Sequence, residues 1–319
     1  MVNKKSVALG LLAASLLLVG CQGPKEKPED VLKKTLEVSS AIDEMAMNGT
    51  LAFDINAEQG KNVAQMSATL DAYSNEKDSA NPVYDMTLKL SGSVKNDGQD
   101  LGKGDVDMNL RFLNKNIYMK LNSLSLNSPA IPSEIIAQLD PVKGSWYEFP
   151  MSLMGPNAPT DVLSMKKEDK MKAKQALIDN NAIKITEDKG IENGMYHYAF
   201  TLDPDKTKAA LAQAQGTLSD ADKKGMDDFF AKSTLTGELW INQADKKLSR
   251  VALNLQGKDP SGSGKITLNV AVTYPTGRVV EKPQSKTYME LVTSLQGLMG
   301  GGAAAPTPSA PVLEEGGDQ

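Results

Sequence analysis

Two stretches, YDMTLKLS at residues 84–91 and DVDMNLRF at residues 105–112, decide the fold. In both, apolar side chains occupy every second position and polar ones lie between them. Because successive side chains of a β-strand point to opposite faces, this period of two predicts strands with one apolar and one solvated face. The same alternation recurs at residues 50–56, 117–121, 251–256 and 266–274. One-sided strands of this kind are typical of antiparallel sheets.

Turn residues separate these strands. Asn-Asp-Gly at 96–98 and Asn-Gly at 193–194 favour tight hairpins, and residues 259–264 are rich in Gly, Ser and Pro. We therefore expect about eleven strands.

Apolar residues at helical spacing predict amphipathic helices over residues 29–45, 161–180 and 288–299. Asp203 before Pro204 is typical of a helix start, with the helix reaching about residue 215, and Ser219 with Asp222 predicts another to about residue 232. A sheet with one apolar face needs a cover, which these helices supply. The pattern thus predicts an α+β fold.

The N-terminus reads as a secretory signal. Lys4 and Lys5 precede a short apolar run, residues 7–19, that ends in Leu-Val-Gly before Cys21. This ending resembles the bacterial lipobox, which implies cleavage before Cys21 and acylation of its thiol. The alternative is an ordinary signal peptide with an incidental cysteine. We expect a signal peptide at 1–20, a lipidated tether at 21–28, one domain at 29–299 and a disordered tail at 300–319.

These features together resemble the LolA/LppX-like bacterial lipoproteins. The resemblance is carried by the lipobox, the tether, the first helix, the alternating strands, and the segments WYEF (146–149), GELWIN (237–242), KLSRV (247–251), TYP (273–275) and EKP (281–283). It implies a strongly curved antiparallel sheet, a half-barrel whose concave apolar face is covered by helices around a cavity. Members of the group carry acyl chains of lipids or lipoproteins. This chain is longer, with extra helical material around 160–180 and 203–232.

Composition removes most catalytic chemistry. The chain has one Cys and one His, so it has no material for a disulfide or for multi-Cys or multi-His metal sites. Its net charge of −5 argues against nucleic-acid binding, which depends on Lys and Arg. His197 is expected on a strand, on the face opposite Tyr196 and Tyr198, without a catalytic partner. We predict no catalytic residue, no metal and no cofactor.

Methionine is unusually frequent, with 15 residues. Its flexible, polarizable side chain suits surfaces that adapt to varied apolar ligands, although ordinary core filling explains it too. Low aromatic content favours an acyl chain over a ring. The predicted ligand-binding residues lie on the apolar strand faces and on the helix at 161–180: Met86, Leu88, Met108, Leu110, Met165, Met171, Leu253 and Val270.

The sequence therefore predicts an envelope lipoprotein, held outside the cytoplasm on a membrane through acylated Cys21, that binds or transports a lipid or acyl chain. The alternative is a structural or protein-interaction lipoprotein with a self-filled core and no ligand. Such a protein is expected to show an exposed apolar patch or a groove for a polypeptide. A hydrolase is a remote third class.

Overall fold

The structure is a computed structural model that describes residues 26–57, 60–78, 81–129, 131, 133–151, 167–215, 220–259 and 262–298. The predicted signal sequence with Cys21, the predicted tail from residue 300 and Met165 lie outside these residues.

One twelve-stranded sheet organises the chain, in the order β12-β6-β5-β4-β3-β2-β1-β11-β10-β9-β8-β7. Neighbouring strands are antiparallel except β12 and β6, which are parallel. The strands are β1 (Glu44–Ala57), β2 (Asn62–Asn75), β3 (Val83–Asn96), β4 (Gln99–Leu113), β5 (Asn116–Asn127), β6 (Trp146–Pro150), β7 (Ile183–Glu192), β8 (Met195–Leu202), β9 (Ser233–Asn242), β10 (Leu248–Asp259), β11 (Gly262–Thr273) and β12 (Ser285–Thr287).

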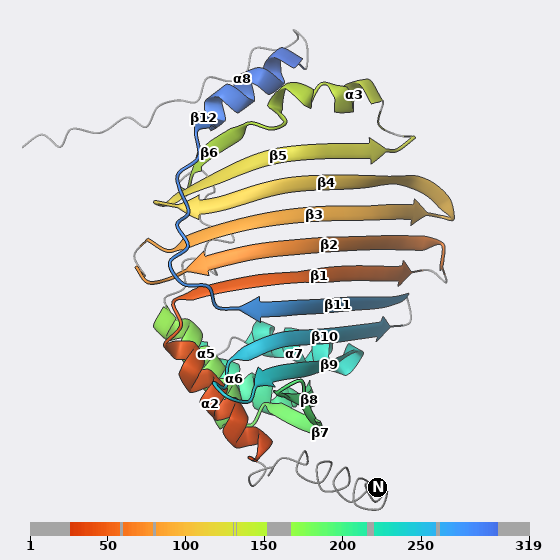
Figure 1. Cartoon of the computed structure of the whole chain (residues 1–319). Helices are drawn as coiled ribbons and strands as arrows, with labels where there is room; N and C mark the ends of the chain where they lie inside the picture. Colours follow the sequence, from red (N-terminus) through yellow and green to blue (C-terminus); the bar gives the residue numbers. More distant parts are fainter. Residues whose placement is uncertain are drawn as a thin grey trace, which may run out of the picture.

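The helices gather near the two edges of the sheet. Figure 1 shows one group beside β7–β10 and a smaller one beside β6. The first group is α2 (Pro28–Ser40), α5 (Lys167–Asp179), α6 (Pro204–Gln215) and α7 (Asp220–Lys232); the second is α3 (Ser133–Ala137), a short 3-10 helix (Asp140–Val142) and α8 (Tyr288–Leu298). This curved, open, mostly antiparallel sheet with helices confirms the predicted α+β half-barrel class, with twelve strands instead of about eleven.

Strands β1–β5 have two distinct ends, which we name by their neighbours (Figure 1). The proximal end carries the start of β1, the end of β2 and the start of β3, close to α2 and α5. The distal end carries the hairpins β1–β2 and β3–β4 and the end of β5. Residues 274–284, which we call the strap, lead from β11 past the proximal ends of β1–β5 to β12 (Figure 1).

Two predicted turns and the predicted helix start at Asp203 are confirmed, whereas Ser219, the other predicted helix start, lies outside the described residues. Asp97 and Gly98 both have positive φ, as a two-residue hairpin requires, and so do Asn193 and Gly194. Asp203 caps α6 by accepting a hydrogen bond from the Lys206 amide at 3.1 Å.

The helix predicted over 29–45 was too long. It ends at Ser40, and Met45 belongs to β1, where it pairs with Ser74 of β2. Sheet pairing therefore overrides the helical spacing that Met45 continues.

The best-buried core lies where α2 crosses the apolar face of β8 and β9. Val31 of α2 is fully buried against Tyr196, Tyr198 and Ile241. Tyr196, Tyr198 and Phe200 are buried while the residues between them are only partly so, which confirms the predicted alternation of β8. This packing fixes the helical group to one edge of the sheet.

Candidate functional site

Strand register places the predicted ligand residues of the sheet on one continuous apolar face. Leu110, Met86, Ala72 and Met47 form one row across β4, β3, β2 and β1. The next row toward the distal end contains the predicted residues Met108, Leu88 and Val270. Leu253 follows one row further on, paired with Leu268.

A cavity of about 400 Å³ opens at the proximal end of this face. It lies between α5, the C-terminal end of α2, strands β1–β3 and the starts of β10 and the strap. Met86 and Met171, both predicted as ligand contacts, line it. The complete lining is Ser39, Ile42, Asp43, Met45, Met47, Ala72, Tyr73, Ser74, Glu76, Tyr84, Asp85, Met86, Met171, Lys174, Leu248 and Tyr274.

The remaining predicted residues are not part of the cavity lining. Leu88, Met108, Leu110 and Leu253 are half-buried on the apolar face, and Val270 is buried there. Their placement extends the apolar surface from the cavity toward the distal end.

Two lining methionines, Met45 and Met47, escaped the sequence prediction. Met45 was assigned to a helix, and Met47 enters the cavity row only through its register with Ala72 and Met86. The alternation of apolar and polar residues at 45–55 indicates a strand that contains both methionines. The strand register that places them beside α5 cannot be predicted from the local sequence.

The floor of the cavity is made by a small residue between two large ones. Ala72 is 7% exposed and sits in register between Met47 of β1 and Met86 of β3. Because a methyl group fills little of the space that the neighbouring methionine side chains span, Ala72 leaves room above the sheet. Met171 of α5 also lines this space.

Tyrosine side chains turn apolar rings toward the cavity while their hydroxyls are engaged. Tyr84 donates to the Glu76 carboxylate at 2.9 Å, and Tyr274 donates to the Leu248 carbonyl at 2.7 Å. Burial raises the pKa of Tyr274 to about 12, so this hydroxyl stays neutral at physiological pH. The tyrosines therefore add apolar wall without leaving unsatisfied polar groups.

Asp85, one of the charged residues of the cavity lining, is tied to the strap. Asp85 accepts from Arg111 Nε at 2.9 Å and from Arg278 Nη2 at 2.7 Å. The Tyr73 hydroxyl lies 2.9 Å from Glu44 Oε2, and the hydrogen bond to Glu44 from the Gly277 amide is the main cause that lowers the pKa of this carboxyl. The strap thus contacts the proximal rim through the Arg278–Asp85 ion pair and through the hydrogen bond from the Gly277 amide to Glu44.

A second polar cluster surrounds His197. Its Nε2 lies 2.9 Å from Glu238 Oε2, its Nδ1 lies 3.3 Å from Glu192 Oε2, and its ring stacks on Trp240 at 4.3 Å between centroids. The sequence did not reveal these two carboxylate partners of His197, because both come from neighbouring strands. Within the described residues, no three His, Cys, Asp or Glu side chains are arranged to hold a metal ion.

No protein-family model matches the chain, and no curated protein matches it. Among solved structures, a DUF1329 family protein from Desulfovibrio piger matches with 9% identity and a TM-score of 0.23, covering 79% of this chain and 93% of its own. The translocator domain of autotransporter NalP from Neisseria meningitidis matches with 10% identity and a TM-score of 0.16, covering 76% and 94%. A beta-barrel-like DUF1849 protein from Brucella abortus matches with 9% identity and a TM-score of 0.15, covering 73% and 98%. Similarity at these TM-scores carries no argument about this chain.

Proposed function

We propose that this protein is a membrane-anchored envelope lipoprotein that binds or transports a lipid, taking an acyl chain into the cavity between α5 and β1–β3. The observation that carries the proposal is the convergence of Met45, Met47, Met86 and Met171 on a cavity of about 400 Å³. That volume lies within the range of pockets for small molecules, roughly 300–1,000 Å³. Flexible methionine walls suit a chain with many conformers.

The alternative of a self-filled core is disfavoured by the same cavity. Ala72, which lies between Met47 and Met86, is too small to fill the space above the sheet. We propose a structural role for His197, whose ring stacks on Trp240 and whose ring nitrogens contact Glu238 and Glu192.

Chain-length dependence tests the proposal. A fluorescent fatty acid bound to the full chain is displaced by fatty acids of increasing length. Each buried methylene contributes about 0.8 kcal/mol, so affinity is expected to rise about fourfold per carbon until the cavity is filled. Absence of probe binding, or affinity independent of length, contradicts the proposal.

Two matched variants locate the binding. Met171→Glu places a charge in the cavity wall, whereas Met226→Glu makes the same change at another half-buried helical methionine, in α7, outside the cavity lining. Probe affinity is expected to fall at least tenfold in the first variant and to stay within twofold in the second. Equal losses in both place the binding elsewhere.

The anchor is tested separately. Acylation of Cys21 predicts that the mature N-terminal peptide begins at Cys21 and carries the mass of its acyl chains. Mass spectrometry of that peptide shows whether Cys21 is acylated. An unmodified Cys21 contradicts lipid anchoring. Within the described residues, no helix is both long and apolar enough to cross a bilayer.

A further inference from the structure

Helix α2 is fixed beside one edge of the sheet. It begins at Pro28 and crosses β8 and β9, where Val31 is fully buried against Tyr196 and Ile241. Figure 1 shows α2 beside the β7–β10 edge and α8 beside the opposite edge. The place where the chain enters α2 is therefore set by the core.

Glu26 extends this attachment to the residues before the helix. Lys246 Nζ donates to Glu26 Oε1 at 2.6 Å, and the Tyr196 hydroxyl donates to the same oxygen at 2.9 Å. Lys246 lies between β9 and β10, where the Gln243 amide donates at 2.9 Å to the carbonyl of Gly194 between β7 and β8. Glu26 and these two connections, residues 193–194 and 243–247, form one packed corner, which we call the tether corner.

The tether corner lies a short length of chain from the proposed anchor. Glu26 is five residues after Cys21. An extended chain spans at most about 3.6 Å per residue, so the segment between them reaches no further than about 18 Å. Whatever path this segment takes, an acylated Cys21 keeps the tether corner within that distance of the lipid headgroups.

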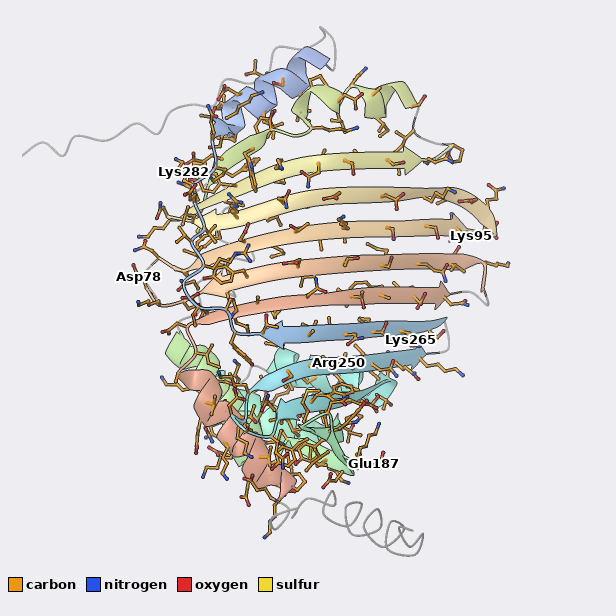
Figure 2. All side chains as sticks on the ribbon, viewed as in Figure 1. Asp78, Lys95, Glu187, Arg250, Lys265 and Lys282 are labelled. Carbon is orange, nitrogen blue, oxygen red and sulfur yellow. The ribbon has the colours of Figure 1, made fainter. Side chains whose placement is uncertain are left out.

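Most of the sheet separates the tether corner from the opposite edge. Eight strand spacings lie between β9 and β6, which at about 4.8 Å each amount to at most about 38 Å. Figure 2 shows Glu187, on β7, toward one edge and Lys282, whose Nζ lies 3.1 Å from Glu148 of β6, toward the other. The net charge of −5 also disfavours contact of the whole sheet with anionic lipid.

We infer that the tether corner is the membrane-facing surface of this protein and that the edge formed by β6, β12 and α8 points away from the bilayer. The inference rests on the proposed anchor at Cys21, and it requires no attraction between the corner and lipid, because the length of the tether sets the distance. Helix α2 then acts as a spacer. Its 13 residues span about 20 Å, and Ser39 near its other end lines the cavity.

Energy transfer from the two tryptophans of the chain tests this orientation. Trp240 lies two residues before Asn242, the last residue of β9, whereas Trp146 begins β6. Full chains with Trp146→Phe or Trp240→Phe keep one donor each. They are purified from membranes and reconstituted into vesicles of phosphatidylcholine and phosphatidylglycerol that contain a dansyl headgroup acceptor. Transfer from Trp240 is expected to exceed that from Trp146 at least twofold.

A longer tether gives the matched control. Ten Gly and Ser residues inserted between Gly23 and Pro24 leave every described residue unchanged and lengthen a flexible segment. In the Trp146→Phe chain, this insertion is expected to lower transfer from Trp240 at least twofold. The comparison needs no replacement of Trp240, so it holds even if Trp240→Phe disturbs the packing of His197 against that ring.

Three results overturn the inference: equal transfer from both tryptophans, stronger transfer from Trp146, or transfer from Trp240 that is unchanged by the longer tether. Failure of the anchor is read separately, from the mass of the N-terminal peptide. If the Cys21 thiol proves to be free, coupling it to a maleimide phospholipid supplies the same attachment point, because the chain has one cysteine. Energy transfer therefore reports the orientation independently of the anchor and of any ligand in the cavity.

Discussion

The two ends of the central strands are built in opposite ways. At the proximal end, helices and the strap cover the sheet, and Asp85, Arg111 and Arg278 form partly buried ion pairs. At the distal end, apolar side chains such as Ile55 and Val94 are exposed. The same strands therefore supply both a packed, cavity-bearing end and an open rim.

The apolar face is therefore not simply a core. A sheet face whose purpose is only stability is expected to be covered along its whole length. Here the cover ends, while apolar residues continue to Ile55 and Val94. The apolar face is therefore packed at the proximal end, where the cavity lies, and exposed at the distal end.

The largest contrast is expected between two isoleucines. Ile241 is fully buried in the core under α2, whereas Ile55 is 52% exposed at the distal end. Ile241→Ala is expected to lower the free energy of unfolding by about 3 kcal/mol, and Ile55→Ala by less than about 0.5 kcal/mol. Urea denaturation followed by circular dichroism measures both. Similar losses would break the distinction between the two ends.

Two glycines give the next contrast. A Cβ at Gly49 would lie 2.3 Å from the Asn269 carbonyl oxygen and 2.8 Å from Val270 Cγ2, whereas a Cβ at Gly264 meets nothing within 4 Å. Gly49→Ala is therefore expected to destabilise the protein by about 2 kcal/mol, and Gly264→Ala to leave stability within about 0.5 kcal/mol. Thermal unfolding of the two variants compares them directly. If Gly49→Ala leaves stability unchanged, strands β1 and β11 can move apart at this position without a cost in stability.

The ion pairs of the strap give a smaller effect. Asp85→Asn removes the charge that faces both Arg111 and Arg278, with Asp85 only 16% exposed. We expect a loss of about 1–2 kcal/mol, between the values for exposed and buried pairs. Lys89→Gln, which breaks the exposed pair with Asp107, is the control and is expected to change stability by less than about 0.5 kcal/mol. Urea denaturation measures the stability of both variants. Equal losses in Asp85→Asn and Lys89→Gln would mean that the strap does not stabilise the proximal end.

The smallest effect concerns pH. Hydrogen bonds from Lys246, Lys34 and Tyr196 hold the pKa of Glu26 at about 2, below its ordinary 4.5. Because the pKa is depressed in the folded state, the stabilisation is present above pH 4.5 and is lost as the pH falls toward 2.

Glu26→Gln is therefore expected to flatten the acid side of the stability curve between pH 5 and 2, and to matter less in high salt. Glu29→Gln, at a neighbouring exposed carboxylate that forms no ion pair with a described residue, serves as control. Titration of the unfolding midpoint against pH shows the outcome. Parallel curves for wild type and Glu26→Gln would contradict the prediction.

Local pattern predicts the strands but not their partners. Alternation around Met86 and Met108 predicts β3 and β4, and Asn96-Asp97-Gly98 joins them as expected. Strand β2 carries a weaker signal, because alanines such as Ala64, Ala68 and Ala72 fill its apolar positions. Strand β12 has only three residues, too few for any period.

The sequence predicts the apolar face of the sheet on which the candidate site lies, but it does not predict the cavity. The residue type that marks it, methionine, is visible in the sequence, and Met86 and Met171 were found in this way. Met171 of α5 lies opposite β1–β3 although more than eighty residues of sequence separate it from Met86. A local sequence pattern does not encode a contact between residues so far apart. The partners of His197 were missed for the same reason, since Glu238 reaches it only through the pairing of β8 with β9.

The central claim, that the cavity beside Ala72 holds a lipid, is tested most directly by native mass spectrometry of the full chain extracted gently from membranes. Ala72→Phe fills the cavity floor, and Ala68→Phe makes the same change on the same strand and face, at an equally buried alanine outside the cavity lining. We expect a co-purifying lipid mass in wild type and in Ala68→Phe, and its loss in Ala72→Phe. Wild-type protein without bound lipid, or lipid retained in Ala72→Phe, would contradict it.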